Sequence, residues 1–421
     1  MRYSLEARPP WPALLLYGIQ WWVVSLPFAV IVGVVAARVQ FSDVAGQMLY
    51  LQKMFAVFGV SLIIQILRGH RLPLVIGPAE VLLVGLLTSA TSPAAAYTAI
   101  ILCGLCMAAL GKSRLLGVAK RLFTGRIVAV ILILVALTCS PIILNLFLQS
   151  PGVPLANFLG GSVLAGVLFA LNKALPGLWK STTLILGLVG GSCLVFALQG
   201  LPEGMWNVSP SASGSGFFLP ALEFDAGALL AFFFCFIALL TNEIGSIEAG
   251  GQMLRADDME GRLKRGVWYS GLSNAACGLL GVIGSVDYAL STGVIAATGC
   301  AARRTMIPCG VLLILCALIP GVMGTLLCVP MVIMASLLQY LMVSLFASGL
   351  EILSRGAGTS GFYEGVTVAF PLMLALLVSY APAHIWADCP GILKPVVANG
   401  FVMGTIAVLF LEHTLCRKAE S

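Results

Sequence analysis

The chain has 421 residues, of which 60% are apolar and only 10% are charged, and its mean hydropathy is +1.04. These values exclude an ordinary soluble globular domain, in which about a quarter of the residues are charged. They favour a protein that is embedded in a lipid bilayer.

Segments that are apolar enough to cross a bilayer follow one another along the chain. A spanning helix needs about 20 residues, and broken spans can be shorter. The predicted fold class is an all-α membrane protein with fourteen transmembrane segments, at residues 12–36, 50–67, 72–90, 96–111, 126–147, 157–172, 181–199, 226–249, 266–283, 287–301, 306–325, 328–349, 363–381 and 392–413.

The longest polar stretch, at about residues 201–225, divides these spans into seven plus seven. A duplicated unit with an odd number of spans inserts its second copy upside down, so the division predicts an inverted repeat typical of transporters. The third and tenth spans are then equivalent, and both are interrupted by helix-breaking residues, at Pro73, Gly77 and Pro78 and at Gly281, Gly284 and Gly293. Broken backbone at membrane depth survives where it is buried or lines a cavity, so the two breaks predict a central binding site.

Basic residues alternate between the two sides of the predicted topology. All Lys and Arg residues except Arg38, Lys53 and Lys394 precede the first span or follow an even-numbered one. Because cytoplasmic loops are enriched in Lys and Arg, both termini are expected in the cytoplasm, and the expected location is a bacterial cytoplasmic (inner) membrane. The net charge of +6 then reflects orientation, and no nucleic-acid partner is expected.

Three buried polar runs, at residues 77–80, 241–246 and 287–291, place carboxyl groups at membrane depth. Such groups are costly and usually face a bundle interior or a water-filled path. Glu80, Glu243 and Asp287 are therefore candidate coupling-ion residues, and Glu80 is also a candidate substrate ligand. A buried structural role is the alternative for each, and Asp287 is expected nearer the outer edge of its span.

Other side chains near these runs could contact a planar solute. Asn242 and Ser246 are four residues apart and share a helix face, and an amide can pair with the amide-like edge of a ring. Gln20 is expected to fix backbone near the site, whereas Trp21 and Tyr288 could stack on a planar substrate. Packing in the core is the alternative for these side chains.

Nothing in the sequence favours an enzyme or a cofactor. Cys103 and Cys106 have C-x-x-C spacing without a neighbouring His, and His70, His384 and His413 are expected at span ends without a metal-binding grouping. No catalytic residue and no metal is expected. The expected coupling ion is H⁺, because a buried carboxylate changes charge on protonation, and Na⁺ is the alternative.

Four segments, in the predicted order along the chain, are similar to motifs of the nucleobase/ascorbate transporter family, which includes the bacterial uracil and xanthine permeases. They are residues 14–20 (LLLYGIQ), 71–77 (RLPLVIG), 293–303 (GVIAATGCAAR) and 347–353 (ASGLEIL). The resemblance implies a core domain at residues 1–122 (spans 1–4) and 225–325 (spans 8–11), and a gate domain at 123–224 (spans 5–7) and 326–421 (spans 12–14). It also implies short antiparallel strands in spans 3 and 10 beside the substrate, and a homodimer formed through the gate domain.

The chain departs from the family pattern at the recognition positions. Asn242 and Ser246 stand where the family has Glu and Asp or His, Leu290 and Ser291 replace a Gln/Glu–Asn pair, Trp21 replaces a His and Glu80 replaces an aromatic residue. With Gln20 and Tyr288, these positions are the candidate substrate-binding residues.

The expected function is that of a secondary active transporter that moves a nucleobase or similar small heterocycle across the bilayer, with H⁺ symport and alternating access of the core against the gate. The alternatives are a carrier of another small solute or an anion on the same fold, as in sulfate and bicarbonate transporters, and, less favoured, a channel. The expected partners are therefore a small-molecule substrate, the lipid bilayer and a second copy of the chain.

Overall fold

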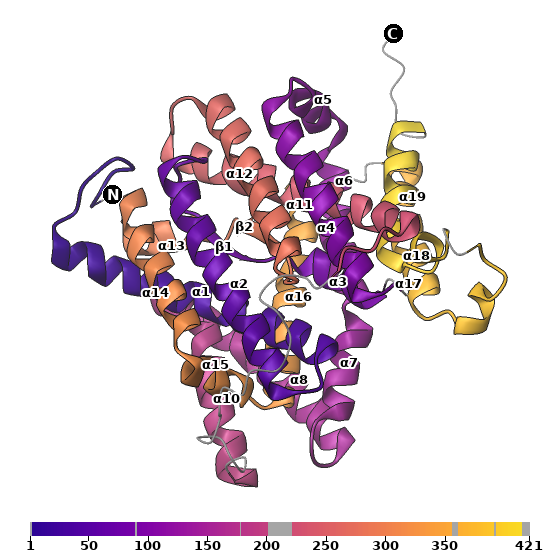
Figure 1. The fold of residues 1–421 in the computed structure, drawn as a ribbon, viewed down its shortest axis with the longest axis horizontal. Coiled ribbons are helices and arrows are strands. Elements are labelled where there is room, and N and C mark those ends of the chain that lie inside the picture. Colours follow the sequence, from indigo (N-terminus) through magenta and orange to yellow (C-terminus); the bar gives the residue numbers. More distant parts are fainter. Residues whose placement is uncertain are drawn as a thin grey trace.

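The computed structural model describes residues 2–88, 91–176, 178–200, 221–355, 361–390 and 393–414. The chain is predominantly helical in these ranges (Figure 1). Its first half contains α1 (Trp11–Gln40), α2 (Val44–Leu67), α3 (Glu80–Thr88), α4 (Pro93–Lys112), α5 (Leu115–Leu122), α6 (Gly125–Thr138), α7 (Ser140–Gln149), α8 (Pro154–Ala174), α9 (Leu178–Ser181) and α10 (Thr183–Gln199).

The second half is also mainly helical, with short 3₁₀ turns between some helices. It contains α11 (Ala226–Leu254), α12 (Met259–Leu279), α13 (Ser291–Thr298), η1 (Arg303–Thr305), α14 (Met306–Leu318), α15 (Pro320–Leu327), α16 (Met331–Arg355), α17 (Phe362–Ser379), η2 (Ala383–Trp386), α18 (Lys394–Val397) and α19 (Gly400–Thr414). Each half also contributes one short strand, β1 (Val75–Pro78) or β2 (Ser285–Tyr288).

Eight helices in the described ranges are long and apolar enough to cross a bilayer. A ninth span results if residues 303–318 and α15, which are bent by 87° relative to each other, are taken together. A multi-pass membrane protein is therefore confirmed. The fourteen predicted segments all coincide with helices or strand–helix units, but several are short, broken or more polar than this criterion allows, so the count of fourteen stays a prediction.

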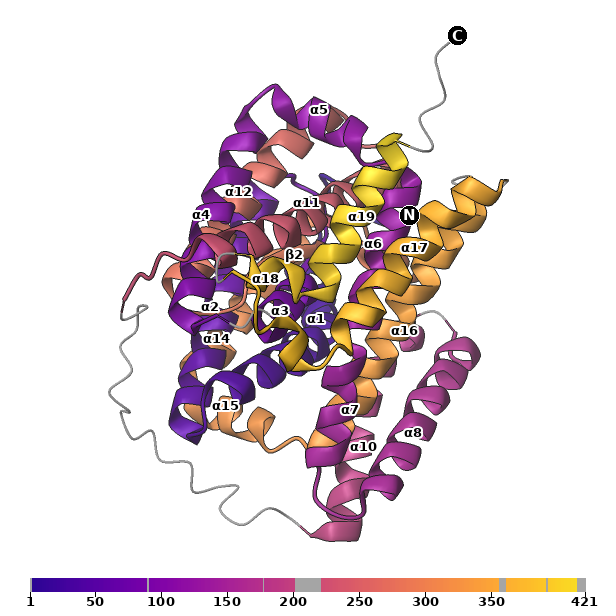
Figure 2. The same cartoon turned by 90° about the vertical axis from the view of Figure 1, so that its right-hand side faces the viewer.

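The helices form two groups that lie side by side (Figure 2). In the first group α2 packs against α14 and α4 against α12, and in the second α6 packs against α16 and α17 against α19. Small residues permit the closest of these contacts, since a Cβ atom added to Gly104 of α4 would lie 2.7 Å from the backbone nitrogen of Ala275 in α12. Such close backbone approach is how helices associate without a hydrophobic driving force from water.

The two strands meet inside the first helix group, near the middle of the molecule (Figure 1). They pair antiparallel, with Val75 opposite Tyr288 and Ile76 opposite Asp287. Pro73 and Pro78 oppose a helix at this point because proline lacks a backbone N–H, and the β-branched Val75 and Ile76 suit an extended chain. The expected antiparallel strands in the third and tenth segments are thus confirmed, each followed by a short helix, α3 or α13.

Candidate functional site

A cavity of about 960 Å³ lies between the two helix groups. The first group lines it with residues of α1, α3, α11 and the turn from β2 into α13, and the second group with residues of α6, α8, α9, α10 and α16. The lining residues are Val24, Phe28, Glu80, Asn242, Tyr288, Ala289, Leu290, Thr292, Gly293, Val294, Ala296 and Ala297 from the first group, and Leu132, Asn172, Lys180, Thr183, Leu184, Tyr340, Leu341, Ser344, Leu345, Ser348 and Glu351 from the second.

The strand pair positions one aromatic and one acidic side chain of the cavity wall. The Tyr288 hydroxyl donates a hydrogen bond to the Pro78 carbonyl at 2.6 Å and also lies 3.1 Å from Glu80 Oε1. Glu80 is the first residue of α3, where the helix dipole favours a negative charge, and its side chain is mostly buried. The Phe28 ring centre is 4.9 Å from that of Tyr288. The first group's wall of the cavity therefore combines two aromatic rings with one carboxyl group.

Polar residues of the second group lie across the cavity from these side chains. They include Lys180 in α9 and Glu351 near the end of α16, and Glu351 pairs with Arg355 at 2.5 Å. Both residues belong to the side of the chain on which Lys and Arg are concentrated. The cavity thus reaches toward the basic side of the protein.

Half of the predicted substrate-binding residues line this cavity. Glu80, Asn242, Tyr288 and Leu290 belong to its wall. Gln20 and Trp21 lie outside it, because Trp21 is only 2% exposed within the apolar core and Gln20 is half-buried on the same helix.

Ser246 and Ser291 also lie outside the cavity wall, where they hold the strands in place. Ser246 Oγ donates to the Asp287 carbonyl at 2.7 Å. Ser291 Oγ donates to the Tyr288 carbonyl at 2.7 Å and accepts from the Val75 N–H at 2.8 Å. Asn242 and Ser246 do share a side of α11, but the cavity reaches only Asn242, since Ser246 lies one turn further along against β2.

The outer edge of β2 is completed by side chains instead of a third strand. Asp287 N–H donates to Glu243 Oε2 at 3.0 Å, and Asn274 of α12 bonds both the N–H and the carbonyl of Ser285 at 3.1 and 2.9 Å. Every backbone polar group at membrane depth needs a partner, because lipid supplies none. Glu243 therefore faces the strand pair and α12 within the first helix group.

Asp287 is fully buried beside Glu243. It lies within the strand pair with 1% exposure, and its expected position near the outer edge of the span stays a prediction. It is buried because β2 folds back against β1 and α11, which cover it on both sides. The carboxyl groups of Glu243 and Asp287 interact electrostatically, and Ser270 of α12 donates a short hydrogen bond to Glu243.

His70 is a residue that the sequence analysis placed at a span end, and it completes this cluster. Its side chain is 0% exposed, and its Nε2 atom lies 3.1 Å from Asp287 Oδ2. Its Nδ1 atom accepts a hydrogen bond from the Leu72 N–H at 2.9 Å, so the neutral ring carries its proton on Nε2, toward Asp287. The signal that could have identified His70 is its position three residues before Pro73, at the entry to the broken span.

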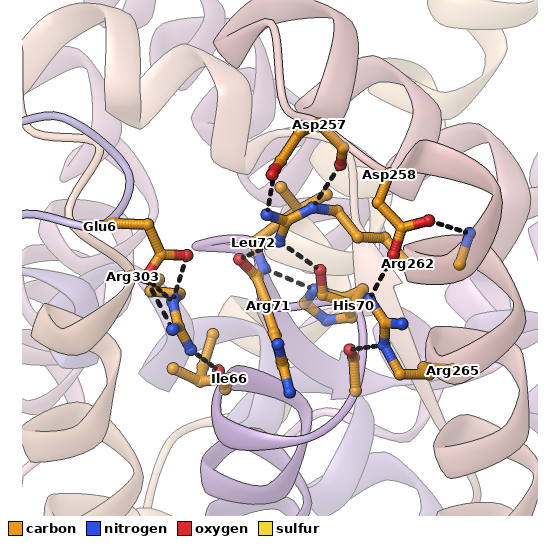
Figure 3. A network of polar contacts seen from close by, with 12 residues as sticks. Glu6, Ile66, His70, Arg71, Leu72, Asp257, Asp258, Arg262, Arg265 and Arg303 are labelled. Atoms are coloured by element: carbon orange, nitrogen blue, oxygen red, sulfur yellow. Dashed lines mark hydrogen bonds and ion pairs between the residues drawn. The ribbon is translucent and has the colours of Figure 1, made fainter.

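A network of arginines joins this cluster to the surface (Figure 3). Arg262 of α12 donates to the carbonyls of His70 and Arg71, both at 3.1 Å, and pairs with the exposed Asp257 at 2.7 Å. The hydrogen bond and the positive charge of Arg262 hold the pKa of Asp257 below its usual value. Arg262 thereby fixes the turn that carries His70.

The sequence analysis missed the cavity residues that the second helix group contributes. Lys180 and Ser344 belong to no motif, and Glu351 lies in the motif at residues 347–353 but was not singled out as a site residue. Only the packing of the two groups brings them opposite Glu80. Phe28 was missed for the same reason, because an aromatic residue in an apolar span looks like core.

Solved structures of anion transporters share this fold. The transmembrane domain of the cyanobacterial bicarbonate transporter BicA superposes with a TM-score of 0.62 at 16% identity, covering 87% of this chain and 96% of that one. Murine Slc26a9, in its inward-facing state, superposes with a TM-score of 0.59 at 12% identity over 96% of this chain and 69% of that one. At such identities the likeness shows the fold alone.

Sequence relatives are permeases. The chain is 25% identical over 305 residues to a proposed purine permease of Clostridium perfringens, covering 70% of this chain and 64% of that one. It is 23% identical to the proposed purine permease YwdJ of Bacillus subtilis over 97% of both chains. It is also 23% identical to the uric acid transporter UacT of Escherichia coli over 275 residues, or 54% of that protein. The chain thus matches less than two thirds of the first and third of these relatives.

The family profile extends this similarity over most of the chain. The profile of the Permease family, that of the xanthine and uracil permeases, matches residues 12–384. The resemblance noted in the four sequence motifs is therefore confirmed. The chain belongs to the xanthine/uracil permease family and is a multi-pass membrane protein.

Proposed function

We propose that this transporter carries a purine or a similar small heterocycle across the bacterial cytoplasmic (inner) membrane, together with H⁺, by alternating access. The observation that carries the proposal is the cavity between the two helix groups, with Glu80, Asn242, Tyr288 and Phe28 on one wall. A purine permease and a uric acid transporter are among the relatives of the chain.

The chemistry of the cavity favours a planar heterocycle with N–H groups. Phe28 and Tyr288 offer ring faces for stacking, Asn242 offers one donor group and one acceptor, and Glu80 accepts hydrogen bonds from ring or exocyclic N–H groups. An ionised Glu80 also repels an anion in the same cavity, which disfavours sulfate or bicarbonate.

Alternating access is supported by mirrored helix pairings. Under the seven-plus-seven repeat, the pair α2–α14 is the counterpart of α12–α4, the pair α8–α10 is the counterpart of α17–α19, and β1–β2 and α6–α16 pair across the repeat axis. We infer from these pairings an inverted repeat in which the first helix group is the core domain, residues 1–122 and 225–325, and the second is the gate domain, residues 123–224 and 326–421.

The proposed orientation places the termini in the cytoplasm. Lys180 and Glu351, which line the cavity, follow even-numbered predicted spans, as do most of the basic residues. We therefore propose that the structure is an inward-facing state whose cavity opens to the cytoplasm. H⁺ is the proposed coupling ion, with Na⁺ as the alternative, because carboxyl groups lie at membrane depth in and beside the cavity.

A homodimer through the gate domain is supported by exposed apolar surface there. Of the most apolar stretch of 18 residues in α8, only 22% is buried within the chain, and in α17 only 28%. Added side chains at Gly160 and Gly166 of α8 would meet open space. Native mass spectrometry of the detergent-purified chain would give a dimer mass if this proposal holds, and a monomer mass would contradict it.

The second candidate function is a carrier of another small solute or an anion, which the likeness to BicA and Slc26a9 favours. Lys180 in the cavity could attract an anion, but Glu80 and Glu351 lie in the same cavity. A channel is less favoured than either carrier.

Uptake into liposomes that contain the purified chain tests the proposal. The panel comprises radiolabelled hypoxanthine, xanthine, guanine, uric acid, uracil, cytosine, bicarbonate and sulfate, with protein-free liposomes as the control. Saturable uptake of at least one heterocycle, increased by an acid-outside pH gradient and abolished by a protonophore, is expected. Uptake of bicarbonate or sulfate alone would overturn the proposal in favour of the anion carrier.

A further inference from the structure

We propose that the coupling proton binds at the buried carboxyl pair of Glu243 and Asp287, behind the strand pair, and that His70 positions this pair. The inference deepens the proposed function and rests on it. It assigns the proton and the substrate to separate places, since the cavity is lined by Glu80 and Tyr288 and not by Glu243, Asp287 or His70.

Burial makes this pair a binding place for one proton. Glu243 is 0% exposed and Asp287 is 1% exposed, and their carboxyl groups interact directly. Two adjacent carboxylates repel each other strongly in a medium of low dielectric, so such a pair readily takes up one proton and titrates as a unit. Among the described residues, this carboxyl pair makes one ion-pair contact, between Asp287 and His70.

The two carboxyl groups differ in their hydrogen-bond partners. Glu243 accepts hydrogen bonds from the Asp287 N–H and from Ser270 Oγ, and its carboxyl group also interacts with that of Asp287. Asp287 Oδ1 is buried without a hydrogen-bond partner in the described part of the chain. Asp287 Oδ2 lies 3.1 Å from His70 Nε2, although the angles at this contact are outside the usual hydrogen-bond range. Asp287 is thus free to take up a proton or to turn its charge toward His70.

The charged and titratable groups that face the cluster come from four elements. Glu243 belongs to α11, Asp287 to β2, and His70 to the turn between α2 and β1, while Arg262 of α12 acts on His70 through its carbonyl and its charge. The uncharged Gln65 of α2 borders the cluster, and it donates hydrogen bonds to Ser270 Oγ at 2.8 Å and to the Gly266 carbonyl at 3.0 Å.

The strand connects this site to the substrate. Successive side chains of a strand point to opposite faces, so Asp287 points toward Glu243 while its neighbour Tyr288 points into the cavity and holds Glu80. A proton that loosens the repulsion between Glu243 and Asp287 moves β2 relative to α11 and shifts Tyr288 with it. In each cycle one proton enters from outside, binds a carboxylate oxygen of the pair, and leaves to the cytoplasm with the substrate.

Transport measurements with Asp287→Asn and Glu243→Gln test this assignment, with the exposed Glu260→Gln as the matched control. The probes are radiolabelled hypoxanthine, xanthine and uric acid in liposomes. With one proton per substrate, a gradient of about one pH unit supports about tenfold accumulation. We expect wild type and Glu260→Gln to reach it, and the two site variants to lose the accumulation while they retain exchange of labelled for unlabelled substrate without a gradient. Accumulation equal to wild type in both site variants would overturn the proposal.

His70→Gln provides a second variant that keeps hydrogen-bonding capacity at this position. As a positioning residue, His70 should alter the pH at which accumulation is half-maximal, with exchange unchanged. A loss of exchange and accumulation together, in this variant and in both site variants, would instead assign the cluster a purely structural role.

Infrared difference spectroscopy of the liposome-bound chain, titrated from acid to alkaline pH without substrate, separates this proposal from the proposed function. We expect the carbonyl band of a protonated carboxylic acid in wild type, and its loss or shift in Asp287→Asn and Glu243→Gln but not in Glu80→Gln. If the wild-type chain takes up no heterocycle but shows this band, the proposed substrate class is contradicted and the proposed proton site is supported. A band that depends on Glu80 alone would refute the proton site and leave the substrate intact.

Discussion

Glu80 of α3 lines the cavity on the side of the first helix group, and it replaces an aromatic residue of the family pattern. Its carboxyl group lies at the start of α3 beside the Tyr288 hydroxyl. A hydrogen bond from a substrate N–H to a charged group contributes about 1.5–3 kcal/mol. The substrate specificity should therefore depend on Glu80, which stands where the family pattern has an aromatic residue.

Glu80→Gln removes this charge and keeps the shape of the side chain. We expect the affinity for the transported heterocycle to fall about 10- to 100-fold, the range that corresponds to the loss of one charged hydrogen bond. Equilibrium binding of the radiolabelled heterocycle to the purified chain measures it, and the exposed Glu260→Gln serves as the control. Affinity equal to wild type would assign Glu80 a structural role.

The element that decides the site is the strand pair, which is completed by Glu243, Ser246 and Asn274 in place of a third strand. Helix α12 lies beside β2, and it also packs closely against α4. Backbone atoms of the two helices touch at Gly104 and Gly271, so larger residues have no space there.

Gly271→Ala tests this close contact between α4 and α12. A Cβ atom there would lie 2.7 Å from both Ala108 Cα and the Gly104 carbonyl oxygen, and backbone cannot yield as a flexible side chain can. We expect overpacking to cost about 1–3 kcal/mol of folding free energy and to lower the thermal unfolding temperature in detergent. Gly160→Ala is the matched control, because its Cβ would meet open space. Equal unfolding temperatures for the two variants would contradict the packing.

The turn between α11 and α12 carries a prediction about pH. Arg262 lowers the pKa of Asp257, so the ionised carboxylate stabilises the fold above the unfolded-state pKa of about 4, and this contribution is lost as the pH falls through the lower folded-state pKa. Asp257→Asn should therefore unfold at a lower temperature than wild type at pH 7, and the difference should vanish in strong acid. A deficit of the same size at both pH values would point to a cause other than the charge.

On the scale of the whole molecule, the cavity lies between two helix groups and reaches toward the basic side of the chain. Under the proposed orientation and alternating access, this side faces the cytoplasm in the present conformation and the opposite side is closed. The gate-side residue Ser348 lines the cavity and is exposed to it, whereas Ser336 on the same helix is 0% exposed.

Ser348→Cys, in a chain whose native cysteines are replaced, reports this opening. We expect a membrane-impermeant maleimide to modify it in inside-out vesicles and to react more slowly when the transported heterocycle is present. Ser336→Cys is the buried control and should stay unmodified. Modification of Ser348→Cys in right-side-out vesicles only would reverse the proposed orientation.

The sequence by itself determined the class of the protein and the place of its breaks. Hydropathy requires a bilayer, and Pro73, Pro78 and the glycines around residues 281–293 oppose continuous helices, so two breaks in the spans follow from local chemistry, whereas the strands at these breaks were implied by the family resemblance. Glu80 and Tyr288 could be identified as site residues for the same reason, since both belong to these breaks.

Only the tertiary structure decided which polar residues meet. Glu243, Asp287 and His70 come from three distant parts of the chain, and no local pattern records that β2 folds against α11 and buries them together. Ser246 and Ser291 were expected at the substrate but complete the hydrogen bonds of the strands, because buried backbone groups need partners before any side chain is free to bind a solute. Lys180 and Glu351 entered the cavity through the packing of one helix group on the other, a long-range contact that sequence periodicity cannot encode.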